Sequence, residues 1–555
     1  HHYVRAAELV HELGGVPDLP SDLGERALGW LEQAAARADQ ADIPVVAEQL
    51  YAEGLRLLGG VHGHRHRLFL TGRARALLGL RELGPARADA SGAIEESRQA
   101  GDDGRVDLGR ALLVLAEIEQ KDADWAASDL ILDEANELFA EIGDQSGEAE
   151  VLRLRGFAAL FRHEYDLANH YLEEALTRFE ALDDARGVAW ALQNLAWSAF
   201  YSGRAEEAEQ RLRRAAATFE SIGDSGGLRW ARGLLAWTRF QQGFSAEAGE
   251  MAEAIVAGDR RGGDRWALGM MLVLAGSVRL WSGRTLSAID RLREAKEVFD
   301  GIGGGTGRGQ ASATLARALV LAGRVEEGLH LAAPEELLGG ISNDPEEFVA
   351  LMAGLGTTVQ VGDVERSEHI LAVVQPLLEL LPSSEVVVGD TERTTSLGLH
   401  RLQRGDVAGA VDGLAALAER LRPAIDPNLS AALALAHVAA GHVEAALQEA
   451  DAVIAEDRSS YLDRITAGIA RALALSRQAE PAATAAFDQV RAAADATEDR
   501  LSQALVRLAR ATAATARGEA GAADLEADAA RHLEELGLAH TSWRNAYALA
   551  MGVPA

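Results

Sequence analysis

Three histidines alternate with other residues in the segment Val61-His62-Gly63-His64-Arg65-His66-Arg67. Imidazole nitrogens bind transition metals, and in an extended segment the three rings would share one face. In a helix, only His62 and His66 would lie together. No carboxylate is near in the sequence, and Arg65 and Arg67 would repel a cation. We therefore predict a solvated linker or helix start here, with no metal site.

A serine motif follows in Gly223-Asp224-Ser225-Gly226-Gly227, which also satisfies G-x-S-x-G. Nucleophilic catalysis would need this serine on a strained turn beside a histidine and an acid. The motif is instead in register with another glycine-rich break at Gly143-Asp144-Gln145-Ser146-Gly147, and helical patterns flank it. We favour a capping turn between helices and predict that the chain has no catalytic residues.

The run from Gly301 to Gly309 has the glycine content of a phosphate-binding loop. Such a loop needs a preceding strand and a lysine that reaches the phosphates, and neither is present. Ile302 lies 80 residues after Ile222, so this run occupies the same kind of break as the serine motif. We predict a flexible joint and no cofactor.

The charge balance limits the partners. The 555 residues include 54 Lys and Arg against 85 Asp and Glu, a net charge of −31. This balance argues against nucleic acid and against anionic membrane surfaces. There is no cysteine, which excludes disulfides, thiolate metal sites and cysteine nucleophiles and fits a reducing compartment. No apolar run is long enough to span a membrane. We expect a cytoplasmic location, in a fragment or processed chain without an initiator methionine.

A 40-residue repeat organises the centre of the chain. Turn glycines recur at this spacing, and a small residue follows each by five positions: Gly203, Gly243, Gly283 and Gly323, with Ala208, Ala248, Ala288 and Gly328. Within one repeat, apolar residues at helical spacing predict helices over 187–202 and 205–222. Fixed spacing of helical pairs is typical of a solenoid.

Looser repeats extend the pattern in both directions. Further turns are expected near Ile43-Pro44, Gly84 and Gln478 and at Gly362, Gly405, Gly441 and Gly518. We predict an all-α solenoid of about thirteen helical pairs, with no sustained strand. Its expected segments are N-terminal units (1–122), a regular array (123–329), an irregular helical seam (330–400) and C-terminal units (401–555).

The repeat resembles the tetratricopeptide repeat (TPR). Leu195-Ala196, Gly203 and Ala208 match that family's leucine–small, turn-glycine and small-residue positions. The resemblance implies a right-handed superhelix whose first helices line a concave groove.

Three short segments are similar to parts of bacterial STAND/AAA ATPase-coupled regulators, namely LuxR-type regulators and class III adenylyl cyclases: His2-Tyr3-Val4-Arg5-Ala6-Ala7-Glu8, Ala27-Leu28-Gly29-Trp30-Leu31-Glu32-Gln33-Ala34 and Trp543-Arg544-Asn545-Ala546. In those proteins a C-terminal TPR arm senses a ligand or partner and restrains an ATPase module of the same chain. This implies a non-catalytic sensor and scaffold arm of a larger ATP-dependent signalling or transcriptional regulator. The alternative is a stand-alone TPR adaptor that binds a peptide segment of a partner protein.

Aromatic residues concentrate between residues 150 and 285. At about 100° per residue, Trp190, Trp197 and Tyr201 fall on one stripe of the predicted first helix. One hypothesis is that this stripe lines the concave groove and contacts a protein or small-molecule ligand. The groove residues would then be Phe157, Trp190, Trp197, Tyr201, Trp230, Trp237, Phe240 and Trp281. Arg153 and Arg229 would select an acidic group on the ligand. The alternative is that these aromatic side chains only pack neighbouring helices together.

Overall fold

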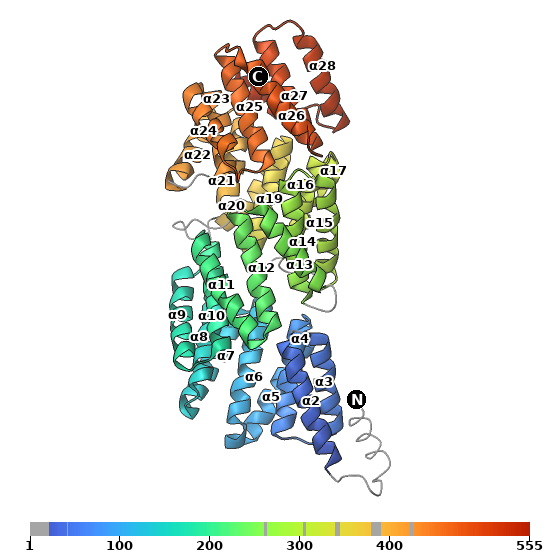
Figure 1. The fold of residues 1–555 in the computed structure, drawn as a ribbon, viewed down its shortest axis with the longest axis vertical. Helices are drawn as coiled ribbons and strands as arrows, with labels where there is room; N and C mark the ends of the chain where they lie inside the picture. Colours follow the sequence, from blue (N-terminus) through green and yellow to red (C-terminus); the bar gives the residue numbers. More distant parts are fainter. Residues whose placement is uncertain are drawn as a thin grey trace. The chain divides into compact units, whose positions relative to one another are not determined.

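The computed structural model describes residues 22–41, 43–259, 264–302, 307–338, 345–378, 390–421 and 426–554. Within these ranges the chain forms 28 α-helices and one short 3-10 helix, and no strand (Figure 1). This confirms the predicted all-α repeat architecture. The segments 2–8 and 303–306, which entered the sequence predictions, lie outside the described residues.

The helices up to the middle of the chain form successive antiparallel pairs (Figure 1). They are α2 (Leu23–Gln40), α3 (Pro44–Leu58), α4 (His64–Gly79), α5 (Leu83–Gln99), α6 (Arg105–Lys121), α7 (Trp125–Ile142), α8 (Gln145–Phe161), α9 (Tyr165–Ala181), α10 (Ala185–Tyr201), α11 (Ala205–Ile222), α12 (Ser225–Gln241), α13 (Ser245–Asp259) and α14 (Arg265–Trp281). The predicted bounds of α11 are those observed, and α10 begins two residues before its prediction.

The second half continues with helices of more varied length. They are α15 (Thr285–Asp300), α16 (Arg308–Leu321), α17 (Val325–Leu331), α18 (Pro334–Leu337), α19 (Pro345–Val361), α20 (Val364–Leu378), α21 (Asp390–Gln403), α22 (Val407–Leu421), α23 (Pro427–Ala440), α24 (Val443–Ala455), α25 (Tyr461–Arg477), α26 (Ala482–Asp495), α27 (Arg500–Ala516), α28 (Ala522–Glu535) and α29 (Trp543–Ala550).

The turns inside the hairpins of the regular array adopt the left-handed backbone conformation that glycine accepts without strain. Gly203 has φ 71°, and Gly243, Gly283 and Gly323 share this sign. Ala123 and His163 hold the same repeat position at φ 58° and 60°, although each carries a side chain. The predicted turns at Gly362, Gly405, Gly441 and Gly518 also have positive φ, and the turn expected near Gln478 is at Ala479. The predicted turn positions are therefore confirmed.

At several breaks between repeats, a phenylalanine near the end of the second helix packs on a glycine near the start of the next first helix. Phe179 is almost completely buried, and a Cβ on Gly187 would lie 2.2 Å from its ring. Phe219 and Gly227 repeat this arrangement at 2.3 Å. The close approach explains why the breaks between repeats are rich in glycine: a larger residue would displace the buried ring.

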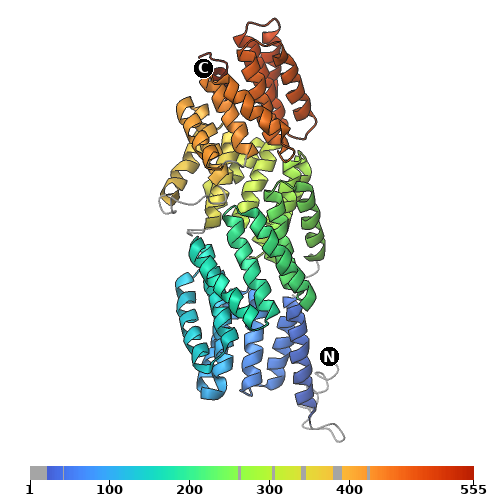
Figure 2. The ribbon, with the colours of Figure 1, turned by 60° about the vertical axis from the view of Figure 1, so that its left-hand side comes forward.

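Successive repeats are also joined by ion pairs between residues 36 positions apart. Arg98 on α5 pairs with Glu134 on α7 at 2.6 Å, and Arg153 on α8 pairs with Glu117 on α6 at 3.1 Å. A separation of 36 is one repeat of 40 less about one helical turn, which brings one helix beside the next in the stack. Figure 2 shows these successive helices lying side by side along α4 to α11.

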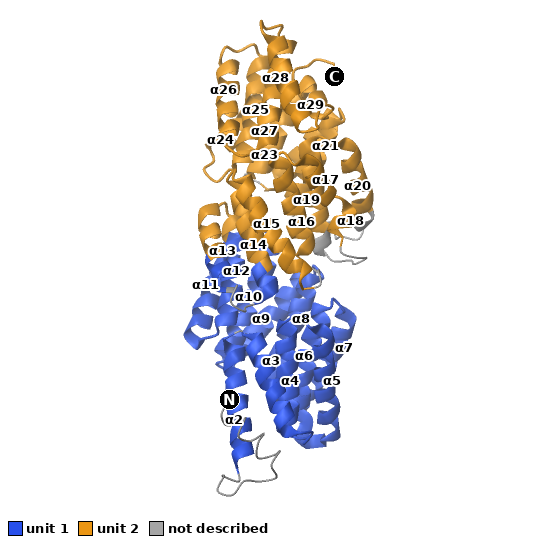
Figure 3. Cartoon of the chain, turned by 90° about the vertical axis from the view of Figure 1, so that its right-hand side faces the viewer, with its two compact units in different colours: residues 1–238, 254–268 blue, residues 239–253, 269–555 orange. Residues whose placement is uncertain are grey.

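The contacts divide the chain into two compact units (Figure 3). Unit 1 comprises residues 1–238 and 254–268, and unit 2 comprises 239–253 and 269–555. The division of the chain into four segments stays a prediction from the sequence.

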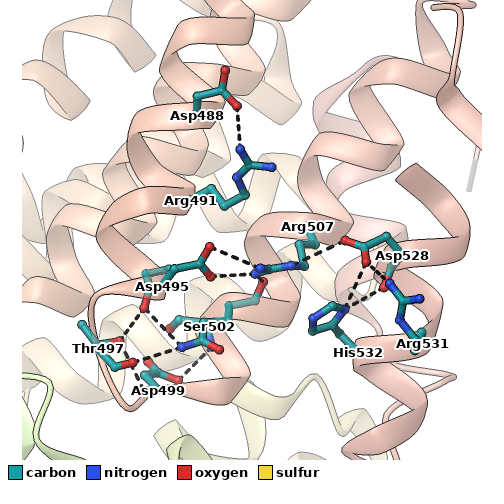
Figure 4. Close-up of polar contacts among 12 residues, drawn as sticks. Asp488, Arg491, Asp495, Thr497, Asp499, Ser502, Arg507, Asp528, Arg531 and His532 are labelled. Carbon is teal, nitrogen blue, oxygen red and sulfur yellow. Dashed lines mark hydrogen bonds and ion pairs between the residues drawn. The ribbon is translucent and has the colours of Figure 1, made fainter. Parts of the chain in front are cut away.

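In unit 2, the C-terminal segment packs on hairpin turns of earlier repeats. The indole N–H of Trp543 donates to the carbonyl of Gln360 at 2.8 Å, and Thr541 Oγ1 donates to the carbonyl of Val361 at 2.7 Å. Figure 4 shows polar contacts around α27: Arg507 pairs with Asp495 at 2.9 Å and with Asp528 at 3.6 Å. These contacts tie the last repeats into unit 2.

Candidate binding site

The serine motif is a helix boundary. Gly223 ends α11 with φ 71°. The carboxylate of Asp224 accepts a hydrogen bond from the backbone N–H of Gly227 at 2.8 Å, as an N-cap does. Ser225 is exposed, and its hydroxyl lies 3.4 Å from the carbonyl of Gln40. The predicted capping turn is therefore observed.

The glycine-rich run around 301–309 is described only at its two ends. Gly301 follows α15, and Gly307, with φ 101°, lies directly before α16. A Cβ on Gly307 would lie 2.6 Å from the ring of Phe299, which repeats the phenylalanine–glycine contact of the earlier breaks.

The histidine segment differs from its expectation in one respect. His64 begins α4 as predicted. A carboxylate is nevertheless close, because α5 brings Glu96 beside His62 and His66. Sequence reasoning missed Glu96 because it is 30 residues farther along the chain. A search for carboxylates one helix away would have found it.

Most of the predicted aromatic residues lie in unit 1, and all of these are half-buried. They are Phe157, Trp190, Trp197, Tyr201, Trp230 and Trp237. Phe240 and Trp281 belong to unit 2, where their rings are 6.2 Å apart. The predicted set is therefore divided between the two units, and the candidate site lies among its residues in unit 1.

Five half-buried rings gather at one end of α8 and α10. Trp197 stacks on Tyr201 with ring centroids 5.4 Å apart and an interplanar angle of 25°. Phe161 contacts Phe157 at 4.7 Å and stacks on Trp125 at 6.2 Å. Phe161, Trp197 and Tyr201 pack against one buried cluster formed by α8 and α9. We call Trp125, Phe157, Phe161, Trp197 and Tyr201 the aromatic cluster.

Trp125 was not predicted as part of this site. It precedes Phe161 by 36 residues, which is the separation that also joins ion pairs of successive repeats. That offset was the sequence feature that could have identified it. Lys121 adds a cation at the edge, 5.3 Å from the centre of the Phe157 ring.

Two further predicted tryptophans of unit 1, Trp190 and Trp230, make other contacts. Trp190 packs edge-on against the buried ring of Phe219 at 5.2 Å. Trp230 stacks on Trp266 at 5.4 Å, and the Arg81 guanidinium lies 5.6 Å from the centre of the Trp266 ring. Trp230 and Trp266 thus lie near a hairpin turn of a much earlier repeat in the same unit.

Arg153 is occupied by carboxylates of its own unit. Its guanidinium contacts Glu150 at 2.5 Å and Glu117 at 3.1 Å, and only 10% of its side chain is exposed. Burial opposes ionisation of Glu150, but Arg153 outweighs it and holds the pKa of this carboxyl below its usual range. The charge of Arg153 is therefore largely compensated. Arg229, on α12, is half-buried.

Among the described helices, none combines the length and apolar character needed to cross a membrane.

A tetratricopeptide-repeat family model matches residues 147–221, which span α8 to α11. The TPR character predicted from the sequence is supported over this segment. No curated protein sequence matches the chain.

Three solved structures are similar to the chain. BtubC (BKLC) from P. vanneervenii is 21% identical with a TM-score of 0.34, over 40% of this chain and 92% of that one. A Rap protein complexed with competence and sporulation factor is 12% identical with a TM-score of 0.47, over 64% and 98%. The apo form of RapI is 12% identical with a TM-score of 0.32, over 54% and 99%.

Proposed function

We propose that the chain is a non-catalytic TPR-type scaffold that binds a segment of a partner protein at the aromatic cluster of unit 1. The observation that carries this proposal is the stacked pair Trp197 and Tyr201, which keeps part of its surface exposed on α10. This pair also lies inside the segment that matches the TPR family model.

Half-buried aromatic rings are suited to this role. Tryptophan and tyrosine dominate binding energy where a partner can complete their burial, because they offer a large rigid surface with little conformational entropy to lose. The five rings of the aromatic cluster are already held by contacts with one another and with α8 and α9. A partner would bind a preorganised surface, which lowers the entropic cost of association.

The chemistry of the cluster favours an apolar anchor on the partner. Arg153 is engaged with Glu117 and Glu150, so selection of an acidic group by Arg153 is not part of the proposal. A leucine, methionine or aromatic side chain on the partner would cover the exposed parts of these rings, and Lys121 beside Phe157 would give it a polar contact. A small apolar molecule could use the same surface.

We further propose a cytoplasmic setting and an arm that belongs to an ATPase-coupled regulator. The support is the sequence similarity of three short segments, of which one, Trp543-Arg544-Asn545-Ala546, forms the start of α29. The stand-alone adaptor explains the same aromatic cluster equally well. The complete reading frame separates the two: a nucleotide-binding module upstream supports the regulator, and its absence supports the adaptor.

Site-specific photo-crosslinking in the native host tests the binding surface. A photoreactive phenylalanine analogue at Tyr201 should capture a partner, since this ring is half-buried at the cluster. The matched control places the analogue at Trp30, which is 56% exposed on α2 and away from the cluster. A partner captured equally at both positions, or at neither, would contradict the proposed surface.

A further inference from the structure

A second group of residues in unit 1 has the composition of a metal site. His62 lies in the connection between α3 and α4, His66 lies in the first turn of α4, and Glu96 lies in α5. Their ligand atoms are all within 4.8 Å of one another. Glu96 Oε2 is 2.6 Å from His66 Nδ1 and 3.3 Å from His62 Nδ1. Two elements that are separate in sequence therefore direct three ligand atoms to one point.

The carboxylate is held in place by the backbone. The N–H of Gly63 donates to the second oxygen of Glu96, Oε1, at 2.8 Å. Gly63 has φ 152°, a conformation that favours glycine. The side chains of Glu96 and His66 are only 13% and 15% exposed, whereas His62 is 72% exposed. The site thus has two largely buried ligands and one exposed ligand on the solvent side.

The neighbouring arginines do not oppose a cation as strongly as the sequence implied. Arg65 pairs with Glu25 at 2.6 Å, and Arg67 pairs with Asp107 at 2.9 Å. His64 also contacts Asp107, at 2.9 Å, so it is separated from the other two histidines. Each arginine charge is compensated by a carboxylate other than Glu96.

We propose that His62, His66 and Glu96 bind a divalent transition-metal ion of the zinc class. Two imidazoles and one carboxylate form a ligand set that zinc uses in proteins, with a fourth position open to water. Imidazole ligands disfavour magnesium and calcium, which prefer oxygen. A bound ion would replace the histidine–carboxylate hydrogen bonds and join the α3–α4 connection to α5.

Zinc titration of the full chain, after removal of metal with a chelator, tests the proposal. We expect one Zn²⁺ to bind per chain, and Co²⁺ in its place to give the visible absorption of a tetrahedral or five-coordinate site. His66→Ala should weaken Zn²⁺ binding about 100-fold or more, since even outer-shell changes cost 10 to 100-fold. His62→Ala should weaken it at least about 10-fold and leave the fold intact, because this side chain is mostly exposed.

Two controls make the result decisive. The double variant His1→Ala/His2→Ala removes another histidine pair and should bind Zn²⁺ as the wild type does. His369→Ala removes a histidine that contacts a single carboxylate, Glu335, at 3.1 Å, and should also bind normally. The proposal is overturned if the wild type binds no stoichiometric Zn²⁺, or if His62→Ala binds it unchanged while His1→Ala/His2→Ala does not.

Discussion

The phenol of Tyr461 donates a hydrogen bond to Asp499 Oδ2 at 3.1 Å, which joins α25 to the start of α27 in unit 2. Asp499 is completely buried and also caps α27 by accepting from the backbone N–H of Ser502 at 2.8 Å (Figure 4). Burial raises the pKa of this carboxyl to about 6, although its hydrogen bonds favour the charged form.

This raised pKa predicts a pH-dependent stability of unit 2. The carboxyl titrates near 3.8 when unfolded and near 6 when folded, so the folded state holds an extra proton between these values. Raising the pH from about 4 to about 6 should therefore reduce the stability that this group contributes, by up to about 3 kcal/mol. Asp499→Asn keeps a capping residue and removes the titration. The Tm of the wild type relative to this variant should fall over that range and then level off.

The control for this experiment is Asp144→Asn, which changes a half-buried N-cap residue with the same hydrogen-bond geometry at the start of α8. Its effect on Tm, measured at the same pH values, gives the change that comes from replacing an N-cap aspartate by asparagine. An unchanged difference between wild type and Asp499→Asn across this range would refute the assignment to Asp499.

Two hairpin turns should respond to opposite substitutions with opposite signs. Ala123 and Gly203 occupy the same repeat position with φ 58° and 71°. Ala123→Gly relieves a side chain from the left-handed conformation and should raise the free energy of unfolding by about 1 kcal/mol, while Gly203→Ala should lower it by about as much. A Cβ at Gly203 meets nothing within 4 Å, so the effect belongs to the backbone alone.

Urea denaturation measures both turn variants, with Gly29→Ala as the reference. Gly29 lies within α2 with open space around it, so alanine there should stabilise by about 0.5 to 1 kcal/mol. If Ala123→Gly and Gly203→Ala change the free energy of unfolding in the same direction, the backbone conformation of these turns does not control stability.

The serine motif should behave as a cap. Asp224→Ala removes the hydrogen bond to Gly227 and the pairing with Arg186 at 2.9 Å, and should cost about 1 to 2 kcal/mol in unfolding experiments. Ser225→Ala should change stability by less than about 0.5 kcal/mol. An esterase or protease activity that Ser225→Ala abolishes would be incompatible with this interpretation.

Arg153 should matter for stability and not for recognition. Arg153→Leu leaves Glu117 and Glu150 without their cation and should destabilise unit 1 by about 1 to 3 kcal/mol. The loss is no larger because the two carboxylates are partly exposed and regain some hydration. Arg110→Leu, at an exposed position of α6, is the matched control and should have little effect. If Arg153→Leu keeps the wild-type Tm but no longer binds the partner, Arg153 contributes to binding, and this prediction is wrong.

The turns were predictable because the left-handed backbone selects glycine, and the spacing of Gly203, Gly243 and Gly283 repeats that requirement. Ala123 and His163 continue the same spacing towards the N-terminus, and they hold this conformation without being glycine. Helix bounds followed from periodicity, as α11 shows.

The site was harder to predict, because its partners come from neighbouring repeats. Trp125 reaches Phe161, and Glu117 reaches Arg153, across 36 residues. Helical periodicity predicts the side of α10 on which Trp197 lies. It does not predict which residues of the neighbouring repeat pack against that side chain. Glu96 meets His66 only because α5 folds back beside α4.

The affinity of the captured partner for Trp197→Ala and Tyr201→Ala, measured together with their Tm, tests the central claim most directly. We predict that each substitution weakens binding by about 2 kcal/mol, or about 30-fold, while both variants stay folded. Trp30→Ala, at an exposed tryptophan of α2, should bind with the wild-type affinity. If Trp197→Ala and Tyr201→Ala lower Tm and keep full affinity, the aromatic cluster only packs the repeats, and the binding proposal is wrong.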